Sequence, residues 1–283
     1  MVSSRCKLDT KMGYMVIRGE EVQRIFLDEI AMVIIENPAV AMTGCLLSEL
    51  MERKIKVIFC DSKHLPQGEL VPYYGSHDTS RKIRAQIAWT EDVKGMVWST
   101  IVAEKIRQQA CFLAQLGNDA EAQMLYGYIE EMEFQDASNR EGHAAKVYFN
   151  AVFGMDFTRR SDHPANGVLN YGYSILMSAF TREIVACGYQ TQLGLHHENV
   201  FNRFNLSSDL MEPFRILVDR EVKKLDNPEL TKESKRVMAN LLHSQIRIDG
   251  TKQTVLSAIG IYVRSVFQAL QKEDVNLMKF YDV

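Results

Sequence analysis

The sequence has 283 residues, of which 46% are hydrophobic and 24% are charged, as is usual for a globular protein. Its formal net charge of −3 does not indicate a nucleic-acid binder. Binding to DNA would therefore need local basic patches or a partner. No apolar run approaches the roughly 20 residues of a membrane-spanning helix, and the first residues lack the apolar core of a signal peptide. The five cysteines form no CxxC pair, which argues against a zinc site or a disulfide framework and favours a reducing cytoplasm.

The first quarter of the chain has a mostly β pattern, with short apolar runs separated by turn residues. Strands are predicted over residues 14–18, 22–27, 32–35, 57–60 and 70–72. One helix is predicted over residues 43–53, because Thr43 is a suitable N-cap and Leu46 and Leu50 fall on one helical face.

After this region the apolar period changes from two to about 3.6, and Gly75 and Asp78 punctuate the change. Helices are predicted over residues 78–89, 91–116, 119–132, 138–153, 164–187, 209–225, 228–243 and 252–271. With a boundary near residues 73–78, the predicted fold class is α+β. A β-rich domain of residues 1–74 precedes a larger all-α domain of residues 75–283.

Paired histidines and two acids stand close together in the last third of the chain. Asp209 and Glu212 lie one helical turn apart, and His196 and His197 precede them on an apolar segment. Carboxylates together with an imidazole suit Mn²⁺ or Mg²⁺. Two structural alternatives stay open: the acids cap a helix, and the histidines are one buried, hydrogen-bonded residue and one exposed residue.

Glu141 is a further acidic candidate, because helical spacing places it on the same face as Ala145, Tyr148 and Val152. A carboxylate on an apolar face is costly unless a cation or hydrogen bonds compensate its charge. The alternative is a capping box, in which Glu141 reaches back to the backbone N–H of Ser138.

Several arginines are candidates for contacts with DNA phosphates. Arg159 and Arg160 form a short basic turn before a helix that carries Tyr171, a further candidate. Arg203 and Arg84, the last residue of the run Arg81-Lys82-Ile83-Arg84, are similar candidates. The alternative for each of them is an ordinary solvated surface, which is the more frequent role of a charge run.

Three segments occur together in one order: Glu141-Gly142-x-Ala144-Ala145-x-x-Tyr148-Phe149, Asn166-x-x-Leu169-Asn170-Tyr171-Gly172-Tyr173, and Gly194-x-x-His197 with Asp209-Leu210-x-Glu212-Pro213-Phe214-Arg215. This ordered combination resembles the Cas1 family, the CRISPR-associated endonuclease and integrase of spacer acquisition, and the resemblance extends through essentially the whole chain. Residues 57–61 and 71–75, with Arg84-x-Gln86-Ile87-x-Trp89, resemble its type II-A branch most. Family members usually have a further short strand before the position of Ser3, so we expect the first strand to be incomplete here.

The resemblance implies that residues 1–74 form a dimerisation domain and that residues 75–283 form a catalytic domain that binds DNA and one Mg²⁺ or Mn²⁺ ion. Matched by motif, the catalytic residues and metal ligands are Glu141, His197 and Glu212. His197 is preferred to His196 because the family pattern is Gly-x-x-His. Asp209 is then expected to orient a ligand or a bound water molecule.

The implied reaction joins the 3′-hydroxyl ends of short DNA fragments to the ends of a repeat by transesterification. The implied partners are double-stranded DNA, as spacer precursor and as CRISPR repeat, and a Cas2 dimer that bridges two Cas1 homodimers. The type II effector nuclease and its accessory DNA-clamp protein are further expected partners, in the cytoplasm and away from membranes. The alternatives are a metal-dependent nuclease that only hydrolyses branched or linear DNA, and a non-catalytic DNA-binding scaffold.

Overall fold

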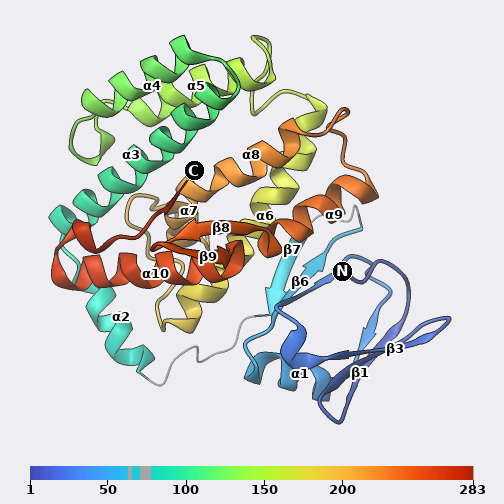
Figure 1. Ribbon diagram of the computed structural model, residues 1–283. Helices are drawn as coiled ribbons and strands as arrows, with labels where there is room; N and C mark the ends of the chain where they lie inside the picture. The colour runs from blue at the N-terminus through green and yellow to red at the C-terminus, as the bar shows by residue number, and fades with distance from the viewer. Residues whose placement is uncertain (63–65, 71–77, 283) are drawn as a thin grey trace. The chain divides into compact units, whose positions relative to one another are not determined.

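The computed structural model describes residues 1–62, 66–70 and 78–282 (Figure 1). Its backbone contacts divide the chain into one unit of residues 1–77 and a second of residues 78–283. The first unit is rich in strands and the second is mainly helical, which confirms the predicted α+β class. Most of the predicted boundary region, residues 73–78, lies outside the described residues.

In its described residues, the first unit contains two small sheets and one helix. Strands β1 (Lys7–Lys11), β2 (Tyr14–Arg18), β3 (Val22–Phe26) and β5 (Ala41–Met42) form a sheet in the order β3-β2-β1-β5. Strands β4 (Met32–Ile35), β6 (Lys56–Cys60) and β7 (Pro66–Leu70) form a sheet in the order β4-β6-β7. The 3₁₀ turn η1 (Leu27–Glu29) and helix α1 (Gly44–Glu52) complete the unit. A strand was predicted over residues 70–72; residue 70 ends β7, and residues 71–72 lie outside the described residues.

Local sequence explains how this unit is assembled. Met12 and Gly13 both have positive φ angles, 52° and 79°, as a tight hairpin turn between β1 and β2 requires. Thr43 caps α1 as predicted, since its hydroxyl accepts a hydrogen bond from the backbone N–H of Leu46. The alternating apolar residues of the strands then bury a core in which Leu8 and Leu46 are fully covered.

The second unit is built from helices of very different lengths. They are α2 (Thr79–Ile87), α3 (Glu91–Gln115), α4 (Asp119–Glu130), α5 (Arg140–Phe153), α6 (Pro164–Ala186), α7 (Asn205–Leu210), α8 (Arg215–Lys223), α9 (Lys232–Asn240) and α10 (Val255–Lys272). Short 3₁₀ turns join several of them: η2 (Phe134–Asp136), η3 (Glu212–Phe214), η4 (Leu241–His243) and η5 (Val275–Leu277). Helices α3, α4 and α5 pack against one another, while α6 contacts α8, α9 and α10 (Figure 1).

Helix α6 is the central element of this unit. Pro164 occupies its first turn, where its missing N–H costs nothing, and the imidazole of His163 accepts a hydrogen bond from the N–H of Ala165. Its apolar residues are buried on several sides, as expected for a helix in the interior of a bundle. Among the residues that the structure describes, no helix is both long and apolar enough to cross a bilayer.

Two predictions for this half of the chain need correction. The predicted all-α domain also holds a small sheet, in the order β10-β8-β9, formed by β8 (Gln245–Ile248), β9 (Thr251–Thr254) and β10 (Tyr281–Asp282). The single helix predicted over residues 209–225 is interrupted. Helix α7 ends at Leu210, and Pro213, which cannot donate a helical hydrogen bond, lies in η3 before α8 begins.

Candidate metal centre

A lysine side chain joins two of the predicted metal ligands. Lys105 comes from the middle of α3, Glu141 from the first turn of α5, and Glu212 from the start of η3. The ammonium group of Lys105 lies 2.5 Å from Oε1 of Glu141 and 2.5 Å from Oε2 of Glu212. Two acids that are far apart in the sequence therefore share a single cation.

Glu212 is held as a carboxylate in an almost fully buried position. Its side chain is 5% exposed, and its second oxygen accepts a hydrogen bond of 2.8 Å from Nε of Arg215. Burial alone would raise the pKa of Glu212, but Arg215 and Lys105 outweigh burial and lower this pKa to about 2. The carboxylate therefore stays ionised at neutral pH.

The loop before α7 wraps around the buried carboxylate of Asp209. The backbone N–H groups of Leu195 and His196 donate to Oδ2 of Asp209 at 2.6 and 3.1 Å. The N–H of His197 donates to Oδ1 at 3.2 Å, and Nδ1 of His197 lies 2.5 Å from the same oxygen. Because Asp209 engages Nδ1, the other ring nitrogen, Nε2, is left for a metal ion.

The negative charges of Glu141 and Glu212 affect the pKa of His197. Its pKa is raised chiefly by the hydrogen bond to Asp209, which acts against burial, and further by the negative charges of Asp209, Glu212 and Glu141. The imidazole thus lies within electrostatic reach of both acids that hold Lys105. The neighbouring His196 is exposed, and its ring stacks on Trp98 with a centroid distance of 4.5 Å.

Gly194 allows this tight loop to form. A Cβ atom at position 194 would collide with the carbonyl oxygen of His197 and with Oδ2 of Asp209. Only glycine permits so close an approach of backbone and carboxylate. The Gly-x-x-His spacing therefore has a physical basis in this chain.

The side chains of Glu141, Glu212 and His197 have the chemical groups that a divalent cation prefers. Two carboxylates and an imidazole suit Mg²⁺ or Mn²⁺, and the carboxylates already hold one cation, the Lys105 ammonium. In the described part of the chain no cluster of three His, Cys, Asp or Glu residues has metal-binding geometry. An ion bound by Glu141 and Glu212 would take the place of the Lys105 ammonium.

Neither capping interpretation agrees with the structure. The carboxylate of Asp136, rather than Ser138, accepts hydrogen bonds from the backbone N–H groups of Arg140 and Glu141 at 2.7 and 3.0 Å. Asp209 lies inside α7 and binds the preceding loop, so it does not begin a helix that contains Glu212. The histidine alternative is closer to the structure, since His196 is exposed and the half-buried His197 is hydrogen-bonded.

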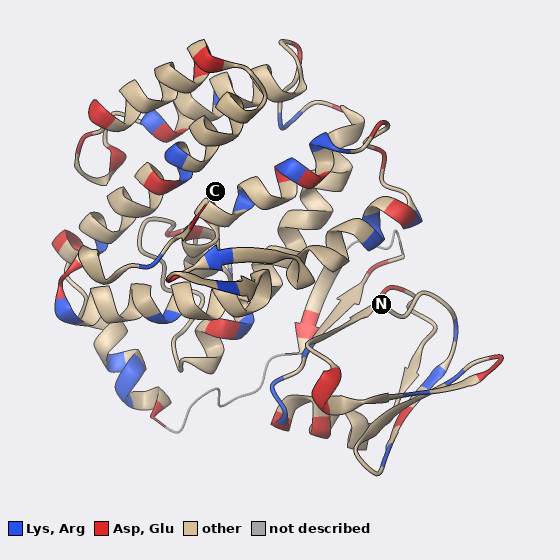
Figure 2. Cartoon of the chain, in the orientation of Figure 1, with Lys and Arg blue, Asp and Glu red and all other residues tan. Residues whose placement is uncertain are grey.

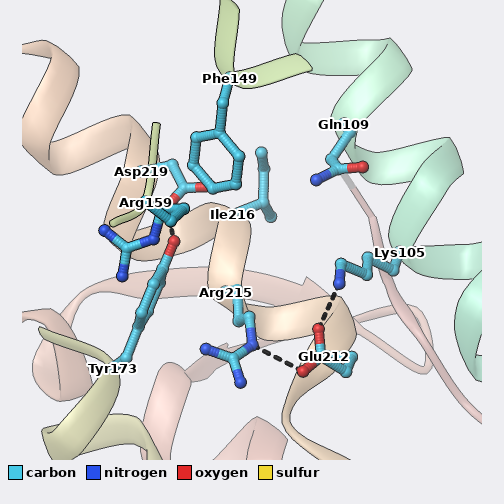
Figure 3. A pocket seen from close by; sticks show the side chains of 9 residues that line it. All are labelled: Lys105, Gln109, Phe149, Arg159, Tyr173, Glu212, Arg215, Ile216 and Asp219. Atoms are coloured by element: carbon cyan, nitrogen blue, oxygen red, sulfur yellow. Dashed lines mark hydrogen bonds and ion pairs between the residues drawn. The ribbon is translucent and has the colours of Figure 1, made fainter. Parts of the chain in front are cut away.

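A pocket of about 240 Å³ opens beside Lys105 and Glu212 (Figure 3). Asp219 lies in its wall and accepts hydrogen bonds from the hydroxyl groups of Tyr148, at 3.0 Å, and Tyr173. Burial raises the pKa of Asp219 to about 6, although the two hydroxyl groups and nearby arginines act in the opposite direction. The pocket thus combines cations, a buried acid and aromatic rings next to the candidate metal ligands.

The predicted DNA contacts differ widely in accessibility. Arg159 lines the same pocket, and its guanidinium donates to the side-chain oxygens of Asn166 and Asn170 at 2.5 and 2.6 Å. Arg84, Arg160 and Arg203 are exposed, and lysines and arginines are interspersed with acids along the helices (Figure 2). The prediction for Tyr171 does not fit, because its side chain is fully buried.

Sequence reasoning missed Lys105 and Asp219. A signal existed for Lys105, because its neighbours Ile101, Val102 and Ile106 are apolar and buried, so a charged residue there needs a partner. Asp219 offered no comparable signal, since its two tyrosine partners come from α5 and α6.

Comparisons with known proteins agree with this fold and identify a family. The family model of the CRISPR associated protein Cas1 matches residues 1–255. A CRISPR-associated endonuclease Cas1 of Neisseria meningitidis serogroup C is 38% identical over 248 residues, which cover 86% of this chain and 81% of that protein. Among solved structures, a Cas1 protein from Thermotoga maritima gives a TM-score of 0.78 at 19% identity, with 95% of this chain and 96% of that chain covered. A casposase bound to its integration product gives 0.77 at 18% identity, with 95% and 90% covered.

Fold and family match together define a CRISPR-associated endonuclease. The chain belongs to the Cas1 family, as its ordered motifs implied. Its function is accordingly that of a Cas1 endonuclease and integrase in CRISPR spacer acquisition.

Proposed function

We propose that Glu141, His197 and Glu212 together hold one Mg²⁺ or Mn²⁺ ion with which this chain joins DNA strands. The reaction transfers the 3′-hydroxyl end of a short double-stranded DNA fragment to a phosphodiester bond at the end of a CRISPR repeat. The observation that carries the proposal is the single ammonium group that Glu141 and Glu212 share, within electrostatic reach of His197. A pair of acids that stabilises one cation is suited to stabilise another.

Neighbouring residues orient His197 and keep Glu212 ionised, as metal binding requires. Asp209 fixes the ring of His197 through Nδ1, and Glu212 stays ionised because of Arg215 and Lys105. When bound, the divalent ion supplies Lewis-acid stabilisation of the phosphoryl group and lowers the pKa of the attacking hydroxyl group. The hydroxyl group of the DNA is the nucleophile, so the chain needs no Ser-His-Asp or Cys-His arrangement.

The exposed arginines Arg84, Arg160 and Arg203 serve this reaction by holding DNA phosphates, and Arg159 does so from the pocket beside Glu212. A chain of net charge −3 gains from an assembly in which basic surfaces of several subunits add up. Joining two strands at opposite repeat ends needs two active subunits at a fixed separation. We therefore propose two homodimers, formed through residues 1–74, that a Cas2 dimer bridges.

One solved structure supports the choice of Cas2. The Cas6-RT-Cas1–Cas2 complex contains a chain that this protein matches with a TM-score of 0.76 at 17% identity, covering 98% of this chain and 35% of that one. Assignment to the type II-A branch stays a prediction based on residues 57–61, 71–75 and 84–89, and the Neisseria relative does not decide it. Copurification with a type II effector nuclease and an accessory DNA-clamp protein from the same cytoplasm tests that branch.

A strand-joining assay tests the proposal. The protein and Cas2 are incubated with Mn²⁺, 3′-hydroxyl DNA and a plasmid that carries the repeat. We expect joined products from the natural protein, none from Glu141→Ala, and normal amounts from Glu130→Ala, which removes an exposed acid at the end of α4. Cut DNA without joining would indicate a hydrolytic nuclease, and DNA binding without either product would indicate a scaffold.

A further inference from the structure

Asp219 lies in the middle of α8 and forms a junction with two other helices. Its carboxylate accepts a hydrogen bond of 3.0 Å from the hydroxyl group of Tyr148 on α5, and a second one from the hydroxyl group of Tyr173 on α6. Each of the three residues is at most 8% exposed. These three residues, called the Asp219 cluster below, therefore join α5, α6 and α8 at one buried point.

The hydrogen bond from Tyr148 connects the cluster with Glu141. Tyr148 follows Glu141 by seven residues in α5, so the two side chains lie two turns apart on the same helical face. This step corresponds to about 10 Å along the helix axis. Because α5 is a rigid element over this length, the bond between Tyr148 and Asp219 fixes where α5 places Glu141 relative to α8.

Tyr173 connects the cluster with Glu212. The guanidinium of Arg215 lies over the ring of Tyr173, 4.8 Å from its centroid, and donates a hydrogen bond of 2.8 Å to Glu212 (Figure 3). A second guanidinium, that of Arg159, lies 5.1 Å from the same centroid. Cation–π contacts of this kind hold ring and guanidinium in register. Asp219 thus acts on the position of Glu212 through Tyr173 and Arg215.

The buried carboxylate is costly for the folded chain. Burial raises the pKa of Asp219 to about 6, although its two hydroxyl partners and the nearby Arg159 and Arg215 act in the opposite direction. An acid whose pKa is higher in the folded than in the unfolded state destabilises the folded state at neutral pH, where it is ionised. In some proteins, buried polar groups that lower stability specify one arrangement of their neighbours. For Asp219 these neighbours are the elements that carry two of the proposed metal ligands.

We propose that Asp219 is a positioning residue that sets the distance between the carboxylates of Glu141 and Glu212. The consequence for metal binding rests on the proposed function. The distance itself does not, because the ammonium group of Lys105 already lies between the same two acids, at 2.5 Å from each. A disturbed cluster therefore weakens Mn²⁺ binding and also loosens the ion pairs of Lys105 in the absence of metal.

Tyr148→Phe tests this role, because it removes one hydroxyl group of the cluster and keeps the ring. We expect the Kd of Mn²⁺ in calorimetry to rise about tenfold, as when a group that orients a metal ligand is lost. In metal-free protein, NMR follows the exchange of the Lys105 ammonium protons with water. This exchange should be faster in Tyr148→Phe than in the natural protein.

Tyr126→Phe is the matched control. It removes a hydroxyl group that lies 3.3 Å from Sγ of Cys111, between α3 and α4, and neither of these helices carries a proposed metal ligand. Both the Kd of Mn²⁺ and the proton exchange of Lys105 should keep their natural values in this variant.

A combined variant separates positioning from stability and covers the case in which Tyr148→Phe does not fold. It joins Asp219→Leu with Tyr148→Phe and Tyr173→Phe, so that no polar group of the cluster is left unpaired. Replacing all partners of a buried polar network by apolar groups of similar shape is often neutral for stability. Thermal unfolding should therefore return to near the natural midpoint, whereas the Kd of Mn²⁺ stays raised.

Two results would overturn different claims. Natural Mn²⁺ affinity and natural Lys105 exchange, in folded Tyr148→Phe or in the combined variant, would overturn the positioning role of Asp219. Faster Lys105 exchange in Tyr148→Phe, together with an equal Kd of Mn²⁺ in the natural protein and in Glu141→Ala, would support the positioning of the two acids and overturn the proposed function instead.

Discussion

Replacing Lys105 by methionine tests whether this ammonium occupies the place of the divalent ion. Methionine has nearly the same length and volume, so the change removes the charge with little change in packing. In the natural chain the ammonium is only 12% exposed and contacts Glu141 and Glu212 at 2.5 Å each. Without it the two carboxylates face each other with no cation between them until a metal ion binds.

The size of the effect follows from these contacts. Removing one partner of a buried ion pair costs about 3–5 kcal/mol. Arg215 still compensates Glu212, and Glu141 is 25% exposed to water, so we expect a loss of about 2–3 kcal/mol in the free energy of unfolding without metal. Mn²⁺ no longer has to displace an ammonium, so its affinity should rise about tenfold, which corresponds to about 1.4 kcal/mol.

Isothermal titration calorimetry gives the Kd of Mn²⁺, and thermal unfolding with and without Mn²⁺ gives the stability. Lys56→Met is the matched control, because it removes a similarly buried lysine that contacts Glu69 at 2.5 Å in the first unit. It should leave the Kd of Mn²⁺ unchanged. If Lys105→Met binds Mn²⁺ no more tightly than the natural protein and is equally stable without metal, Lys105 does not hold the place of the ion.

Further predictions concern the histidine loop. Asp209→Asn should weaken Mn²⁺ binding about 10–100-fold in calorimetry, because the ring of His197 loses its orienting carboxylate; an unchanged Kd would refute that role. Gly194→Ala should lower the free energy of unfolding by about 1–3 kcal/mol in denaturant titrations, since the added methyl group collides with the loop. His197→Ala should reduce Mn²⁺ affinity whereas His196→Ala should not, and the reverse result would exchange their roles. Because a metal ion binds neutral imidazole and the pKa of His197 is raised, Mn²⁺ affinity should fall with decreasing pH with a midpoint above the ordinary 6.5, and a lower midpoint would contradict this.

The sequence predicted long helices well and the small sheet poorly. Helices α3 and α6 follow a sustained 3.6-residue period and begin and end within two residues of their predicted limits. The β8–β9 hairpin was partly assigned to a helix, although Asp249 and Gly250, with φ angles of 52° and 71°, are a typical tight-turn pair. Strand β10 comes from the end of the chain, and such nonlocal pairing leaves no local pattern.

The candidate site was accessible to sequence reasoning only in part. Motif spacing singled out Glu141, His197 and Glu212 as candidate metal ligands, and this assignment stays a prediction. The same local patterns are typical of helix caps, and only the tertiary contacts argue against that alternative. Asp136 assumes the capping role because a preceding 3₁₀ turn aims its carboxylate at α5. Lys105 could not be paired with its two acids from sequence, since three separate elements bring them together.

Anomalous scattering from crystals of the natural protein with Mn²⁺ tests the central claim most directly. The account predicts one manganese peak that the carboxylates of Glu141 and Glu212 and the Nε2 atom of His197 coordinate, with the Lys105 ammonium displaced. A manganese peak elsewhere, with Lys105 still between both acids in protein that joins DNA strands, would contradict it.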